Sequence, residues 1–115
     1  MSKQISNFDI HDLMVAALEG GINYWCNEVR IKEYPSDIKD GEVMEASEII
    51  SRGGKLELSD DDEVWELDKV KFLKGLKKVM VWGDFDNVED LMEVHDAETV
   101  DVLIQYALFD EIVFG

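Results

Sequence analysis

Two glycine pairs in the sequence stand beside side chains that could bind a ligand. Gly20-Gly21 precedes the aromatic pair Tyr24-Trp25. Adjacent residues on an extended chain point to opposite faces, so the two rings do not easily share one core, and we expect Tyr24 to be exposed or to line a cavity. An aromatic ring beside a glycine turn can stack on a base or a peptide. For Trp25, packing in the core is the alternative interpretation.

The second glycine pair, Gly53-Gly54, follows Arg52, one of only two arginines in the chain; the other is Arg30. Arginine can bind phosphate or carboxylate through two parallel hydrogen bonds. The alternative is that Arg52 lies at the end of a helix, where it favours the helix dipole and pairs with a carboxylate. The residues predicted to bind a ligand or partner are Tyr24, Trp25, Arg30, Arg52, Gly53 and Gly54.

The charge distribution is strongly acidic and uneven. The net charge is −16, and five of the eleven basic residues lie between Lys69 and Lys78, with none after Lys78. Too few bases remain to pair the acids of a predicted hairpin tip and of the C-terminal half. The predicted acidic partner face is Asp60, Asp61, Asp62, Glu63, Asp84, Asp86, Glu89 and Asp90. Such carboxylates can occupy basic sites that normally hold phosphates, or they can simply keep the protein in solution.

The residue types exclude several classes of function. A negative surface repels nucleic acid and anionic membranes, so we expect no direct binding to either. His11 and His95 are the only histidines and Cys26 is the only cysteine, which leaves no zinc-binding set. The acidic run Asp60–Glu63 lacks the spacing of a calcium loop, and the glycine pairs match no phosphate-binding fingerprint. We therefore expect no enzyme, no metal site and no cofactor.

Length and apolar content predict a single domain over residues 1–115. The chain is long enough for one core, and its apolar content of 46% exceeds that of a disordered acidic tail. No apolar run approaches the roughly 18 residues of a membrane span and residues 1–12 contain no apolar stretch typical of an export signal, so we expect neither feature. A single cysteine suits a reducing compartment, so we expect a cytoplasmic protein.

Apolar periodicity predicts the elements that position these residues. We expect helices from near Phe8 to the first glycine pair, over 44–52, over 69–82 and from Asp96 to about Phe109. We expect strands over 26–34, 55–59, 63–67 and 111–114, while residues 84–95 show no clear pattern. Gly75 inside the third helix indicates close backbone packing. The order predicts an α+β fold, a small and mostly antiparallel sheet with three to four helices packed on it.

Four segments, in order and together covering most of the chain, resemble a family of small, uncharacterised phage and prophage proteins. They read ALEGGINYWC (17–26), ISRGGKLEL (50–58), FLKGL (72–76) and IQYALFDEIVFG (104–115). The last segment of that family often reads ALFGEIV, and here Asp110 stands where a glycine would favour a tight turn. The resemblance carries no established activity, so what it implies is a biological setting.

Small accessory phage proteins are often stoichiometric inhibitors of host defences, among them anti-CRISPR proteins and sponges for nucleotide immune signals. The resemblance therefore implies a phage protein that inhibits a host defence in the host cytoplasm. The acidic charge adds the expected mechanism, in which a non-enzymatic inhibitor places its acidic surface on the basic nucleic-acid-binding site of a defence protein. One alternative is a sponge that holds a nucleotide signal in a pocket near Tyr24, Trp25 and Arg52. Another is a structural or regulatory phage protein that forms a homodimer through exposed apolar surface.

Overall fold

Alternating apolar and polar residues in three segments produce a short antiparallel sheet. The computed structural model describes residues 5–39 and 42–115. Its strands are β1 (Glu28–Glu33), β2 (Lys55–Ser59) and β3 (Val64–Leu67), in the order β1-β2-β3. Both neighbouring pairs are antiparallel, and β2 and β3 form the predicted hairpin around the acidic turn.

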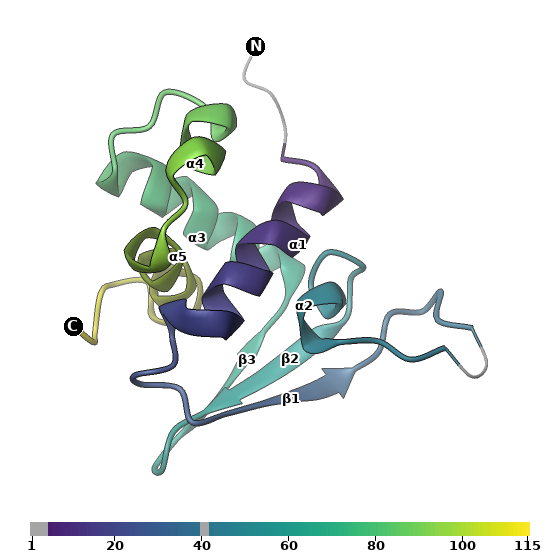
Figure 1. Ribbon diagram of the computed structural model, residues 1–115. Helices are drawn as coiled ribbons and strands as arrows, with labels where there is room; N and C mark the ends of the chain where they lie inside the picture. Colours follow the sequence, from purple (N-terminus) through teal and green to yellow (C-terminus); the bar gives the residue numbers. More distant parts are fainter. Residues whose placement is uncertain (1–4, 40–41) are drawn as a thin grey trace.

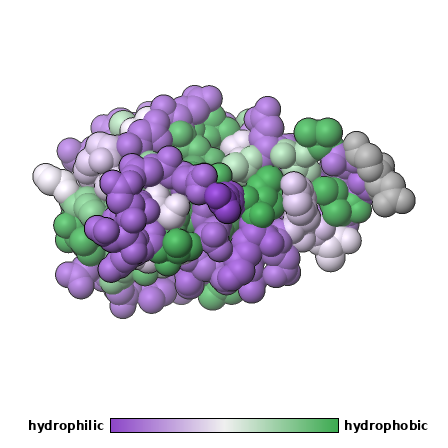
Figure 2. Space-filling model, turned by 90° about the horizontal axis from the view of Figure 1, so that it is seen from below, coloured by the Kyte–Doolittle hydropathy of each residue, from purple (hydrophilic) through white to green (hydrophobic). Residues whose placement is uncertain are grey.

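The two faces of the sheet differ in chemistry. Leu58 of β2 is fully buried, and the register places it between Val29 of β1 and Trp65 of β3. The opposite face carries charged side chains, of which Lys32 and Glu66 form an ion pair with an N–O distance of 2.5 Å. Figure 2 shows the molecule from the side on which the sheet lies, and most of that surface is hydrophilic. The sheet therefore presents one face to the helices and one to solvent.

Helices lie on the apolar side of the sheet (Figure 1). They are α1 (Asn7–Ala16), α2 (Ala46–Ile49), α3 (Lys69–Trp82), α4 (Val88–Val94) and α5 (Ala97–Phe109), with a π-helical turn η1 (Ala17–Gly21) after α1. Asp68 accepts a hydrogen bond from the backbone N–H of Lys71 at 2.8 Å, and Asp96 from that of Thr99 at 2.9 Å. These caps begin α3 and α5, and both helices start where they are predicted to start. The sheet and helices together confirm the α+β class.

Gly21 brings η1 against the start of α5. A Cβ atom at Gly21 would lie 2.7 Å from Val100 Cγ2 and 3.1 Å from the carbonyl oxygen of Ala97, whereas one at Gly20 would have no neighbour within 4 Å. The predicted helix stop at this glycine pair is a widened turn, in which the N–H of Ile22 bonds to the carbonyl of Ala17 at 3.1 Å. One glycine therefore serves packing, and the other leaves open space beside the backbone.

Helices α3 and α5 cross where Gly75 removes a side chain. A Cβ at Gly75 would lie 2.5 Å from the carbonyl oxygen of Leu103 and 2.7 Å from the backbone nitrogen of Ala107. Both distances are well below van der Waals contact, so the two backbones approach each other more closely than any other residue at position 75 would allow. The close packing predicted at Gly75 is confirmed.

Two elements differ from the prediction. The helix expected over 44–52 is shorter, because α2 spans only Ala46–Ile49 and the chain then turns toward Gly53, whose φ is +91°. The unassigned stretch 84–95 contains α4, which begins where Asn87 accepts a hydrogen bond from the N–H of Asp90 at 2.9 Å. Within residues 5–39 and 42–115, none of the helices combines the length and the apolar content that crossing a membrane would require.

The prediction of a strand over residues 111–114 is wrong. These residues are not part of the sheet and follow α5 as an irregular segment, which with Asp110 and Gly115 we call the C-terminal tail (residues 110–115). Asp110 adopts the left-handed conformation with φ +66°, and its N–H bonds to the carbonyl of Tyr106 at 3.1 Å. The tight turn thus forms around an aspartate, whose carboxylate pairs with Lys74 and Lys78.

Candidate functional site

A buried glutamine holds the C-terminal tail on α5. Gln105 Oε1 accepts hydrogen bonds from the N–H groups of Val113 and Phe114, each at 2.7 Å. Its Nε2 donates to the carbonyl of Phe114 at 3.2 Å and to Asp101 Oδ1 at 2.9 Å. One side chain thus supplies the pairing that a neighbouring strand would give, which is why the tail keeps a fixed place without joining the sheet.

Aromatic rings pack against the C-terminal tail and also help to hold it in place. Trp25 is 5% exposed and packs with Trp65, Phe109 and Phe114 at ring-centroid distances of 5.7, 5.8 and 4.9 Å. The core interpretation of Trp25 is therefore the one observed. Tyr24 is 59% exposed, in agreement with the prediction that the two neighbouring rings face different surroundings.

Two open grooves share the C-terminal tail as a wall. The hairpin groove, of about 430 Å³, is lined by Asp60, Asp62, Glu63, Trp65, Phe109, Glu111, Val113 and Phe114. The Tyr24 groove, of about 680 Å³, is lined by Gly20, Gly21, Tyr24, Trp82, Ala97, Glu98, Asp101, Val102, Gln105, Ile112, Phe114 and Gly115. Glu111 and Val113 line the first groove and Ile112 the second, as alternating side chains of an extended chain do.

The hairpin groove is lined by both carboxylates and aromatic rings. Asp60 Oδ1 accepts hydrogen bonds from the N–H groups of Asp62 and Glu63 at 2.8 and 2.7 Å, which shapes the turn between β2 and β3. Within the described part of the chain, no lysine or arginine pairs with Asp60, Asp62, Glu63 or Glu111. Carboxylates beside aromatic rings suit a cation, through charge-assisted hydrogen bonds and cation–π attraction.

The predicted acidic face is divided in the folded protein. Its first four members, Asp60 to Glu63, lie at the hairpin tip, where Asn27 also donates a hydrogen bond to Asp61 at 2.7 Å. The other four, Asp84, Asp86, Glu89 and Asp90, lie around the start of α4, at the opposite end of the molecule in Figure 1. The prediction placed all eight carboxylates on one face, but the fold places them on two separate surfaces. Glu111 joins the hairpin tip instead.

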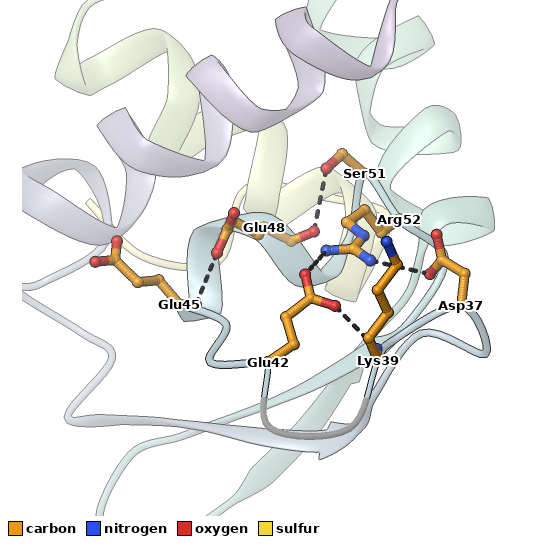
Figure 3. A network of polar contacts seen from close by, with 7 residues as sticks. All are labelled: Asp37, Lys39, Glu42, Glu45, Glu48, Ser51 and Arg52. Atoms are coloured by element: carbon orange, nitrogen blue, oxygen red, sulfur yellow. Dashed lines mark hydrogen bonds and ion pairs between the residues drawn. The ribbon is translucent and has the colours of Figure 1, made fainter.

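The guanidinium of Arg52 forms ion pairs with two carboxylates of its own chain (Figure 3). It contacts Glu42 at 2.9 Å and Asp37 at 3.3 Å, and the hydrogen bond from Arg52 lowers the pKa of Glu42 below its ordinary value. Gly54 packs beside Glu33, whose carbonyl oxygen would lie 2.5 Å from a Cβ at that position. Arg52 thus pairs with carboxylates, as the alternative predicts, but it does not lie at a helix end, because α2 ends at Ile49.

The residues of the predicted nucleotide pocket are not brought together. Trp25 is in the aromatic core, and Arg52 closes the loop between β1 and α2, so neither lines the Tyr24 groove. Arg30 lies on the solvent face of the sheet, where it is exposed and pairs with Glu28 of the same strand at 2.9 Å. Of the six predicted binding residues, Tyr24 alone lines either of the two grooves described above.

Asp101 is the site residue that the sequence did not reveal. Its side chain is 7% exposed and accepts hydrogen bonds from Tyr24 Oη at 2.5 Å, Trp25 Nε1 at 2.7 Å and Gln105 Nε2 at 2.9 Å. Burial of the hydroxyl and its bond to Asp101 raise the pKa of Tyr24 to about 12. The available signal was spacing, since Asp101 and Gln105 stand four residues apart beside the apolar stripe of α5.

Comparisons with protein-family models, with curated proteins and with solved structures gave no match for this chain. The resemblance to small phage proteins therefore stays a prediction. The two grooves and their chemistry are the basis on which function is argued below.

Proposed function

We propose that the protein is a non-enzymatic binding protein that holds a basic protein surface in its hairpin groove. The observation that carries this proposal is a set of four carboxylates that have no basic partner within the described residues and that line one groove together with three aromatic rings. The carboxylates are those of Asp60, Asp62, Glu63 and Glu111. Arginine side chains fit such a groove, because the guanidinium both pairs with carboxylates and stacks on aromatic rings.

Charge decides which class of partner is favoured. The chain carries 27 acidic and 11 basic residues, so its field attracts a basic surface and repels phosphates. A basic surface that accepts these carboxylates would normally hold the phosphates of a nucleic acid, and the bound protein would block it. The resemblance to phage accessory proteins suggests a host antiviral protein as the owner of that surface.

The nucleotide-sponge alternative has less support. The Tyr24 groove is lined by Glu98 and Asp101 and, among the described residues, by no lysine or arginine. Arg52, the cation expected to hold the phosphate, already contacts two carboxylates elsewhere. A phosphate placed beside Asp101 would meet like charge in a poorly solvated position, which is unfavourable.

The test compares two triple variants with the same change in net charge. In the first, Asp62→Asn, Glu63→Gln and Glu111→Gln neutralise the hairpin groove. In the second, Asp84→Asn, Asp86→Asn and Asp90→Asn neutralise the opposite end. Binding of a fluorescently labelled nona-arginine peptide is measured by anisotropy from about 0.1 M to about 1 M NaCl, which shortens the Debye length from about 10 Å to about 3 Å.

We expect the hairpin variant to lose at least about tenfold in affinity and the matched control to lose little, with binding of the unmodified protein falling steeply in salt. Equal losses in both triple variants would mean that net charge alone attracts the peptide, and the groove would have no special role. Binding that is indifferent to salt would overturn the proposal outright.

A further inference from the structure

The carboxylate of Asp101 is buried, and no charged group in the described part of the chain pairs with it. It is 7% exposed, and its three hydrogen-bond donors, from Tyr24, Trp25 and Gln105, are all neutral groups. A buried charge is unfavourable unless hydrogen bonds or an opposite charge compensate it. Here hydrogen bonds supply part of that compensation, and within the described residues no lysine, arginine or histidine supplies the rest.

Asp101 retains capacity for one more donor. Each carboxylate oxygen accepts two hydrogen bonds. Oδ1 accepts from Trp25 and Gln105, whereas among residues 5–39 and 42–115 Tyr24 is the only donor to Oδ2. Asp101 is also among the residues that line the Tyr24 groove, which is the side from which a further donor could approach it.

The walls of the Tyr24 groove are aromatic and apolar. Tyr24 and Trp82, which are 59% and 39% exposed, line it together with Ile112. Glu98 is exposed at the same groove, and the open space beside Gly20 lets a ligand approach the backbone of η1. The volume of about 680 Å³ is within the range of roughly 300–1,000 Å³ typical of small-molecule sites.

We propose that the Tyr24 groove binds a small organic cation, a primary ammonium joined to a flat apolar body. The ammonium lies at Glu98 and Asp101, where it gives the buried carboxylate an opposite charge. The apolar body lies against the rings of Tyr24 and Trp82, which attract cations and bury hydrocarbon. This site is separate from the hairpin groove and does not depend on the function proposed for it.

The probe is phenethylamine, with 2-phenylethanol as its matched neutral analogue. The two molecules share the phenyl ring and the chain length, and they differ only in an ammonium or a hydroxyl group at the end. Isothermal titration calorimetry gives the affinities, and two-dimensional NMR shows whether the amides of Gly20 and Tyr24 shift. We expect the amine to bind at least about tenfold more tightly than the alcohol.

Three variants test which carboxylates contribute to binding of the amine. Asp101→Asn keeps the size of the side chain and Glu98→Gln alters only an exposed one, and each should weaken the amine at least about threefold without affecting the alcohol. Glu57→Gln, on the solvent face of the sheet, removes the same charge outside the groove and should change nothing. Because Glu98 is exposed, its variant remains informative even if Asp101→Asn unfolds.

Three results would overturn the proposal. The first is no binding of phenethylamine up to about 10 mM, a weak limit for a small-molecule site. The second is equal affinity for the amine and the alcohol, which would leave no role for charge. The third is an amine affinity that responds to Glu57→Gln as strongly as to Glu98→Gln. The triple variant of the hairpin groove should leave amine binding intact, so the two proposed sites succeed or fail separately.

Discussion

The rings of Trp25 and Phe114 are stacked, with centroids 4.9 Å apart and planes only 4° from parallel. Trp25 also packs edge-on against Trp65 of the sheet and donates its indole N–H to Asp101 of α5. A single side chain therefore connects the sheet, the last helix and the C-terminal tail. Since Phe114 lines both grooves, the shape of each groove depends on this stacking.

Gln105→Met tests how the tail is held. The substitution keeps an unbranched side chain of similar length and removes every hydrogen bond that Gln105 makes to Val113, Phe114 and Asp101. Each buried polar group left unpaired costs about 1–3 kcal/mol, so we expect unfolding in urea to show a loss of about 2–4 kcal/mol. Carboxypeptidase should also release the tail faster. An unchanged urea midpoint with unchanged digestion would contradict the role assigned to Gln105.

Gly75→Ala separates helix propensity from packing. In an isolated helix this change stabilises by about 1 kcal/mol. In this protein the new methyl group would meet the backbone of Leu103 at 2.5 Å, so we expect a net destabilisation of about 1–3 kcal/mol. Gly20→Ala is the matched control, because its methyl group meets no atom within 4 Å. The midpoints of thermal unfolding of the two variants test this prediction. A more stable Gly75→Ala protein would contradict the close crossing of α3 and α5.

The pKa of Tyr24 predicts a loss of stability in alkali. Its value of about 12 in the folded protein lies above the ordinary value of 10.0, so the folded state holds the phenol proton more tightly than the unfolded state. The resulting stability is fully present below pH 10.0 and is lost as the pH rises from there toward about 12. Absorbance titration should show one late-ionising tyrosine, absent in Tyr24→Phe. A Tyr24→Phe protein with the same alkaline unfolding profile would contradict this assignment.

The turn at Asp110 predicts an order of stability among three variants. Asp110 combines a left-handed backbone with ion pairs to Lys74 and Lys78. Asp110→Gly loses the pairs and gains an unstrained turn, whereas Asp110→Ala loses the pairs and keeps the strain. We therefore expect the alanine variant to melt lowest, with the glycine variant close to the unmodified protein. If the alanine variant melted highest, the left-handed turn would have no energetic role.

Local signals made most of the fold predictable. The caps at Asp68 and Asp96 and the alternation in β2 and β3 act within a few residues, so their elements follow from sequence neighbours alone. The tail was mistaken for a strand because residues 111–114 have an apolar pattern typical of one. Their backbone partner is the side chain of Gln105, and a pairing between a side chain and a distant backbone leaves no periodic trace.

The candidate sites were predictable only in part. The prediction that Tyr24 is exposed is confirmed, whereas Trp25 is buried. The extended chain on which that prediction rested is not observed, because both residues lie in a turn and both side chains donate to Asp101. The role of Asp101 does not follow from the sequence, because an acid beside an apolar stripe looks like any solvent-facing acid until its donors are known. The grouping of acids into one face failed for a related reason, since residues 60–63 and 84–90 are separated by the whole length of α3.

The π-helical turn η1 makes chain length, in addition to the glycine at position 21, a sensitive variable at the Tyr24 groove. A π-helical turn holds one more residue per hydrogen-bonded loop than an α-helix, and each helical residue rotates the chain by about 100°. Deleting Gly20 would let α1 continue as an ordinary helix and would rotate Tyr24 away from Asp101. Single-residue insertions and deletions in residues 17–21 are therefore the changes that we expect to create or abolish this groove.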